Sequence, residues 1–105
     1  MNVSCFASAC ALMLLALPLH AQAAPPVEIR KFAFEPKEIT VTPGTTVAWI
    51  NHDETPHAII AADKSFASKA MDTDDRFEYT FTNEGDFAYA CTLHPFMTGI
   101  VHVRK

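Results

Sequence analysis

The chain has 105 residues, of which 12 are acidic and 8 are basic, so its formal net charge is −4. A mildly acidic balance without a basic cluster argues against a nucleic-acid-binding surface and against affinity for anionic membranes. Once the N-terminal segment described next is set aside, about 80 residues remain, which is the length of one small domain.

The first 23 residues are predicted to be a cleaved secretory signal peptide. Residues 10–19 are apolar, and Ala21-Gln22-Ala23 is a site of the kind that signal peptidases cut. The apolar run is too short to span a bilayer as a helix, which needs about 20 residues. An uncleaved membrane anchor is the alternative. We expect residues 24–105 to form one exported, periplasmic domain that is monomeric and not inserted in a membrane.

The exported segment has the pattern of an all-β fold. Short runs alternate apolar and polar residues, and turn signals such as Pro43-Gly44 and Asn83-Glu84-Gly85 separate them. The apolar positions are Val27, Ile29, Phe32 and Phe34, whose alternation is broken, then Ile39 and Val41, Val47 and Trp49, Ile59, Phe77, Tyr79 and Phe81, and finally Phe87, Tyr89 and Cys91, before a last strand at 99–103. Residues 63–75 lack the pattern and are expected to form a loop or one irregular helical turn. Short strands at this spacing predict a β-sandwich or a barrel.

One short loop carries three side chains that bind metals. Cys91, His94 and Met97 stand three residues apart at the end of a predicted strand, and Cys91 is the only cysteine that remains after processing. A lone cysteine in an exported protein is either a liability or a reactive or metal-binding thiol. Thiolate, imidazole and a weak thioether suit copper in both oxidation states, whereas zinc rarely recruits a methionine.

The second histidine of such a site is expected to be His57. Two histidines and a cysteine in one plane, with a long axial methionine, make the blue-copper arrangement. His57 opens a β-run after a polar loop, whereas His52 lies in the same loop without an apolar run after it, and His102 alternates within the last strand. Taken singly, such residues are more often solvated histidines, core methionines or buried cysteines. Together they predict a site for one copper ion.

These motifs resemble the cupredoxin family and, within it, the amicyanins. The matching residues are Ile29, Phe32, Phe34 and Pro36, then Ile39, Val41 and Gly44, Val47, Trp49 and Asn51, Pro56 and His57, Gly85, Phe87 and Tyr89, and the loop from Cys91 to Met97. The loop is the strongest match, because two-residue gaps on both sides of its histidine typify amicyanins. The resemblance implies a Greek-key β-sandwich, a mononuclear copper and periplasmic electron transfer, with a dehydrogenase as donor and a cytochrome c as acceptor.

The resemblance also implies what surrounds the ligands. Asp53 stands where amicyanins place a glutamate that bonds the outer nitrogen of the first histidine, and a solvated loop carboxylate is the alternative. Ala58 stands where the family commonly has an asparagine whose side chain ties the two ligand loops together. That side-chain tie is lost here, although the backbone N–H of Ala58 could still reach the Cys91 sulfur. Thr92 is expected beside the ligands as well.

The predicted function is electron transfer rather than catalysis. Four protein ligands leave no open position for a substrate. His94, with the apolar neighbours Leu93, Pro95 and Phe96, is predicted to form the surface on which redox partners dock. The alternative is a periplasmic copper chaperone or scavenger. Such proteins tend to use methionine- and histidine-rich clusters, and only Met71 and Met97 remain after processing.

Overall fold

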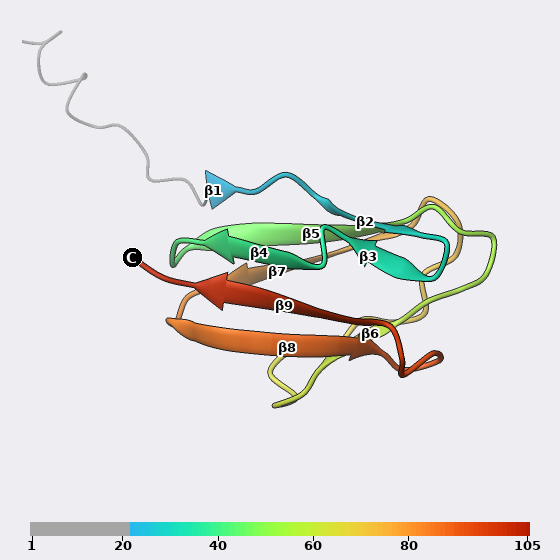
Figure 1. Ribbon diagram of the computed structural model, residues 1–105. Helices are drawn as coiled ribbons and strands as arrows, with labels where there is room; N and C mark the ends of the chain where they lie inside the picture. Colours follow the sequence, from blue (N-terminus) through green and yellow to red (C-terminus); the bar gives the residue numbers. More distant parts are fainter. Residues whose placement is uncertain (1–21) are drawn as a thin grey trace, which may run out of the picture.

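The computed structural model describes residues 22–105, which form two β-sheets packed face to face (Figure 1). The strands are β1 (Gln22–Ala23), β2 (Val27–Arg30), β3 (Ala33–Glu35), β4 (Glu38–Val41), β5 (Thr45–Asn51), β6 (Ile59–Ala61), β7 (Arg76–Phe81), β8 (Gly85–Cys91) and β9 (Thr98–Val103). The predicted small, single-domain β-sandwich is confirmed. The predicted signal peptide lies outside the described residues, apart from its last two, which form β1. Within residues 22–105, no helix has the length and apolarity that crossing a membrane requires.

The pairing of the strands brings two distant segments together at one end of the sandwich. In the first sheet, β7 pairs along one edge of β5, while β1 and β2 pair along the other edge. The strand β3 pairs in turn with β2, in the antiparallel direction. The second sheet has the order β4-β9-β8-β6. Within it, Ile59 at the start of β6 lies opposite Cys91 at the end of β8. The residues just before β6 therefore lie beside the residues just after β8.

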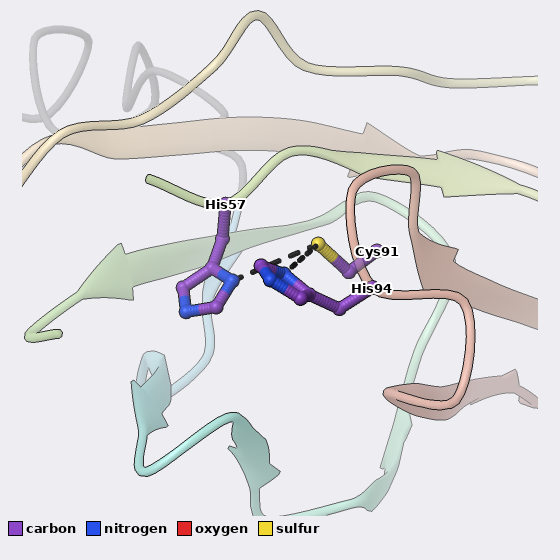
Figure 2. A group of neighbouring side chains, drawn as sticks. All are labelled: His57, Cys91 and His94. Carbon is purple, nitrogen blue, oxygen red and sulfur yellow. Dashed lines mark hydrogen bonds between the residues drawn. The ribbon is translucent and has the colours of Figure 1, made fainter. Parts of the chain in front are cut away.

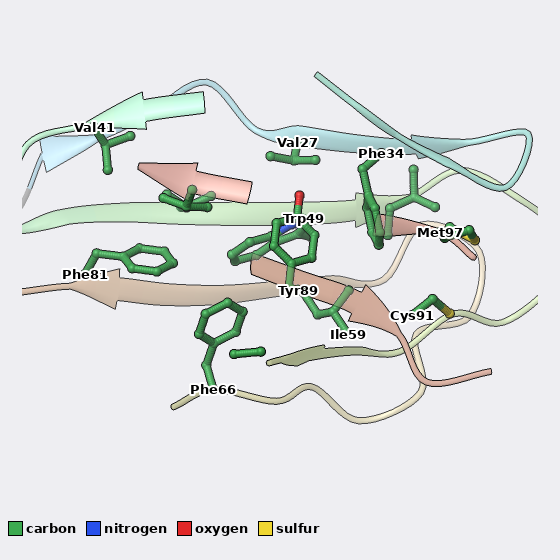
Figure 3. Packing of buried hydrophobic residues seen from close by; sticks show 14 of the residues in the cluster. Val27, Phe34, Val41, Trp49, Ile59, Phe66, Phe81, Tyr89, Cys91 and Met97 are labelled. Carbon is green, nitrogen blue, oxygen red and sulfur yellow. The ribbon is translucent and has the colours of Figure 1, made fainter. Parts of the chain in front are cut away.

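The core between the sheets is rich in aromatic side chains (Figure 3). The Trp49 ring is fully buried, and its centroid lies 5.4 Å from that of Tyr89 and 5.7 Å from that of Phe66. Phe66 belongs to the long loop between β6 and β7, which has no helical turn. Large aromatic groups dominate the energetics of a small core, so this loop helps to hold the sheets together although it lacks strand alternation.

The break in the predicted alternation of the first apolar run corresponds to a turn that contains Phe32. This residue lies in the turn between β2 and β3 rather than in a strand, and its side chain is 41% exposed, whereas Phe34 in β3 is buried. Lys31 and Phe32 have φ angles of 52° and 60°. A two-residue hairpin turn of type I′ requires the left-handed conformation at both positions, and its twist matches that of the flanking strands. Residues with a β-carbon adopt it reluctantly, so other contacts must hold this turn.

His102 connects three strands of the second sheet. Its Nδ1 lies 2.7 Å from an Asp86 carboxylate oxygen on β8, and its Nε2 lies 3.0 Å from a Glu38 carboxylate oxygen on β4. These hydrogen bonds, above all the one with Asp86, raise the pKa of His102 above its usual value. Because the pKa is raised in the folded state, the resulting stabilisation is complete below the unfolded value of about 6.5. This stabilisation is lost as the pH rises through the pKa that His102 has in the folded state.

We therefore expect the metal-free protein to melt at a lower temperature at pH 8 than at pH 6, in part because of His102. The measurement is a series of thermal melts of the wild type and His102→Gln across this range. The difference in melting temperature between the two proteins should shrink as the pH rises, which separates His102 from the other histidines. A difference that stays constant across the range would contradict the prediction.

Candidate metal centre

The candidate metal centre lies at the end of the sandwich where β8 ends and β6 begins (Figure 2). His57 comes from the loop before β6, Cys91 is the last residue of β8, and His94 lies in the loop that connects β8 to β9. The register between β6 and β8 explains why His57 and Cys91 meet although 34 positions separate them in sequence.

The three side chains direct their donor atoms at one another. The Cys91 Sγ atom lies 3.7 Å from His57 Nδ1 and 3.7 Å from His94 Nδ1, and all three donor atoms lie within 4.8 Å of one another. His57 and Cys91 are buried, while His94 is half-buried. Two imidazole nitrogens and one thiol at this separation fit copper, because imidazole and thiolate are the ligands of a trigonal blue-copper site.

Backbone hydrogen bonds close the ligand loop on itself. The N–H of Cys91 donates to the carbonyl of Met97 at 3.0 Å, and the N–H of Met97 donates to the carbonyl of His94 at 2.9 Å. The Met97 side chain is buried and lies near Cys91 at the same end of the core (Figure 3). The loop therefore holds all three of its sequence-predicted ligands in one compact turn.

The two ligand loops are tied to each other through the backbone. The N–H of Thr92 donates to the carbonyl of Ala58 at 2.8 Å. Ala58 is buried, whereas the Thr92 side chain is exposed. This hydrogen bond needs no side chain, so it links the loops at the position where the resemblance implied the loss of an asparagine tie.

The Asp53 carboxylate orients His57. Its Oδ2 atom lies 2.9 Å from His57 Nε2. Because an ionised carboxylate only accepts hydrogen bonds, Nε2 carries the ring proton and leaves the Nδ1 lone pair facing Cys91. Burial raises the pKa of Asp53, but hydrogen bonds from the Phe32 N–H, the His57 ring and the Lys31 N–H outweigh it, and the pKa lies below its usual value.

Two buried residues that the sequence analysis did not assign fix the loop of His57. Asn51 is fully buried; its side-chain amide donates to the carbonyls of Thr55 at 3.1 Å and Met71 at 2.9 Å, and its side-chain oxygen accepts from the Asp53 N–H at 3.0 Å. The backbones of His57 and Met71 exchange hydrogen bonds of 3.1 and 2.7 Å. Asn51 was among the residues that carry the family resemblance, but its hydrogen bonds to this loop were not predicted.

The other histidines of the described chain lie away from this centre. His52 contacts the Glu28 carboxylate, and His102 is held between the carboxylates of Asp86 and Glu38. The choice of His57 over these two residues in the sequence analysis agrees with this geometry.

The surface beside His94 is apolar. Leu93 is 54% exposed and Phe96 is 74% exposed, and Pro95, between His94 and Phe96, is exposed as well. Phe32, which the sequence analysis placed in a strand, is the third large exposed hydrophobic residue of the described chain. Its ring contacts both imidazoles edge-on, with centroids 5.3 Å from His57 and 5.0 Å from His94.

Comparison with known proteins places this geometry in a family. Residues 21–104 match the model of the copper binding proteins of the plastocyanin/azurin family. Amicyanin of Paracoccus denitrificans is 35% identical over 82 residues, which cover 73% of this chain and 63% of the relative. The chain thus spans less than two thirds of the length of this curated relative.

Solved structures agree with the sequence matches. A reduced variant of amicyanin superposes with a TM-score of 0.73 at 34% identity, covering 77% of this chain and 82% of the other. A purple cupredoxin of Nitrosopumilus maritimus superposes with a TM-score of 0.74 at 32% identity, covering 77% of this chain and all of the other. With its two-sheet sandwich and its group of two histidines and one cysteine, this chain belongs to the plastocyanin/azurin family of copper-binding proteins.

Proposed function

We propose that this protein is a periplasmic blue-copper electron carrier that shuttles one electron at a time between redox proteins. His57, Cys91, His94 and Met97 would hold one copper ion, with the thioether of Met97 as the weakest of the four donors. The observation that carries the proposal is the convergence of three donor atoms within 4.8 Å of one another. Bound copper supplies a one-electron Cu(II)/Cu(I) couple, which none of the side chains provides by itself.

The surroundings of the ligands suit electron transfer because they resist rearrangement. An electron transfer is faster when the site has the same geometry before and after it, since any reorganisation adds to the barrier. Asp53 fixes the tautomer and the orientation of the His57 ring, and the Thr92–Ala58 hydrogen bond joins the two loops. Burial of His57 and Cys91 keeps water from two of the ligands.

His94 is the ligand that connects the site to the outside. Its imidazole is half-buried, and Leu93, Pro95 and Phe96 beside it are exposed. Exposed apolar groups can be desolvated by a partner and released again, which suits the small interfaces of transient redox complexes. Docking here gives an electron a short path through the His94 ring. By analogy with amicyanins, the donor is a dehydrogenase and the acceptor is a cytochrome c.

A copper titration of the mature protein tests this proposal. We expect one equivalent of Cu(II) to saturate the protein, to produce an intense blue colour and to give a reversible Cu(II)/Cu(I) potential in voltammetry. Copper should leave slowly when a chelator is added. Loose binding with rapid transfer of copper to the chelator, and no reversible potential, would instead favour a copper chaperone or scavenger.

A further inference from the structure

The ring of Phe32 touches both imidazoles of the candidate metal centre. Its plane stands at 90° to the His57 ring and at 83° to the His94 ring, so both contacts are of the edge type that aromatic rings prefer. The two imidazoles come from different loops, and their centroids lie 5.2 Å apart. Phe32 comes from a third segment, the turn between β2 and β3. The Phe32 ring therefore connects the two candidate ligands, which come from different loops, to a third segment of the chain.

The backbone of this turn is held by the carboxylate that also holds His57. The Lys31 N–H donates to Asp53 Oδ1 at 2.7 Å, and the Phe32 N–H donates to Asp53 Oδ2 at 3.0 Å. The same Oδ2 atom accepts from His57 Nε2 at 2.9 Å. The N–H groups of these two successive turn residues thus donate to one carboxylate, and successive backbone N–H groups in a turn can form an anion-binding concavity. The Asp53 carboxylate thus fixes the position of the β2–β3 turn relative to the His57 ring.

We propose that Phe32 is a positioning residue for the metal centre, with its ring, anchored through Asp53, fixing the two imidazoles and closing the site on the side of the β2–β3 turn. This inference rests on the proposed copper binding. His94 needs such support because it is half-buried on a loop, and the other phenylalanine beside it, Phe96, is 74% exposed with its ring centroid 6.0 Å away. Phe96 is too exposed to restrain the His94 ring.

The position of the Phe32 ring beside both imidazoles has a direct consequence for the release of copper. Before copper can leave, an imidazole must detach and a water molecule or a chelator must enter. The Phe32 ring opposes both steps, because it restrains the imidazoles and occupies the space beside them. Substitutions in the groups around metal ligands typically change metal affinity by about 10- to 100-fold.

The test compares Phe32→Ala with Lys31→Ala as a matched control, which shortens the neighbouring exposed side chain of the same turn and keeps the backbone N–H that donates to Asp53. Both proteins are loaded with Cu(I), and the transfer of copper to bathocuproine disulfonate is followed by absorbance. We expect release from Phe32→Ala to be about tenfold faster than from the wild type, and release from Lys31→Ala to be unchanged. Phe32→Tyr should restore slow release, whereas Phe32→Leu, which keeps apolar bulk without a ring, should not.

A second readout uses the metal-free protein and so does not depend on copper. Loss of the Phe32 ring should shift the NMR signals of the His57 and His94 ring protons, while the amide signals of β5 and β9 stay in place. Fixed imidazole signals, or equal release rates for Phe32→Ala and the wild type, would overturn the inference and leave the proposed function standing. A wild type that binds no copper would overturn the proposed function itself.

The role of Asp53 is tested by a double-mutant cycle. Asp53→Asn replaces one accepting oxygen with an NH2 group, which donates hydrogen bonds and cannot accept from the turn. If Asp53 acts partly through Phe32, the effects of Asp53→Asn and Phe32→Ala on the release rate should combine to less than their product. Glu54→Gln, at a neighbouring exposed carboxylate, is the control and should have no effect. Effects that multiply would show that Asp53 does not anchor the Phe32 ring.

Discussion

Replacement of Cys91 by serine is expected to abolish the intense visible absorption of the Cu(II)-loaded protein. The band of a blue-copper site arises from charge transfer between thiolate and copper, and Cys91 is the only cysteine of residues 22–105. A serine hydroxyl is a harder and far less easily oxidised donor, so any copper that stays bound should be almost colourless. The measurement is an absorption spectrum after titration with one equivalent of Cu(II).

The controls for this substitution address the fold and the neighbouring side chains. Cys91 is buried against the core, and a buried hydroxyl without a partner costs about 1–3 kcal/mol. Cys91→Ala avoids that cost and should be equally colourless. Thr92→Ser changes the next residue, whose side chain is exposed, and should keep the full band. An unchanged band in Cys91→Ser would show that the thiolate is not a ligand.

The sequence predicted the ligand group because local spacing and strand alternation carry the information. Cys91, His94 and Met97 lie on one loop, so their proximity follows from the chain itself. His57 could be chosen because an apolar run follows it and predicts a strand. That strand is β6, and its pairing with β8 brings His57 to Cys91.

The contacts that hold the ligands were less predictable, because they depend on how distant segments meet. Phe32 fits the alternation of a strand equally well, and only the hairpin register places it in a left-handed turn. That turn reaches Asp53 across 21 positions of sequence. In the same way, Asn51 meets Met71 across 20 positions, and no local pattern signals such a hydrogen bond. Family resemblance supplied Asp53, but nothing in the sequence linked it to the aromatic ring.

Copper is expected to raise the melting temperature of this protein by about 15–30 °C. A ligand that binds only the folded state, at a free concentration a thousand times its Kd, stabilises that state by about 4 kcal/mol. For a domain of 60–100 residues, each kcal/mol shifts the melting temperature by about 4–8 °C. Residues 22–105 contain a single free cysteine and therefore no disulfide of their own, so the metal is their one expected cross-link.

Two histidine variants show whether this stabilisation comes from the proposed site. His94→Ala removes a half-buried ligand, so it should change the melting temperature of the metal-free protein little and lose most of the increase with copper. His102→Gln changes a histidine that is bound to carboxylates on the second sheet, and it should keep the full increase. Calorimetry of the wild type and of both variants, each with and without copper, gives the three differences in melting temperature. Coincident melts of the metal-free and copper-loaded wild type would mean that the aromatic core around Trp49 stabilises the fold without the metal.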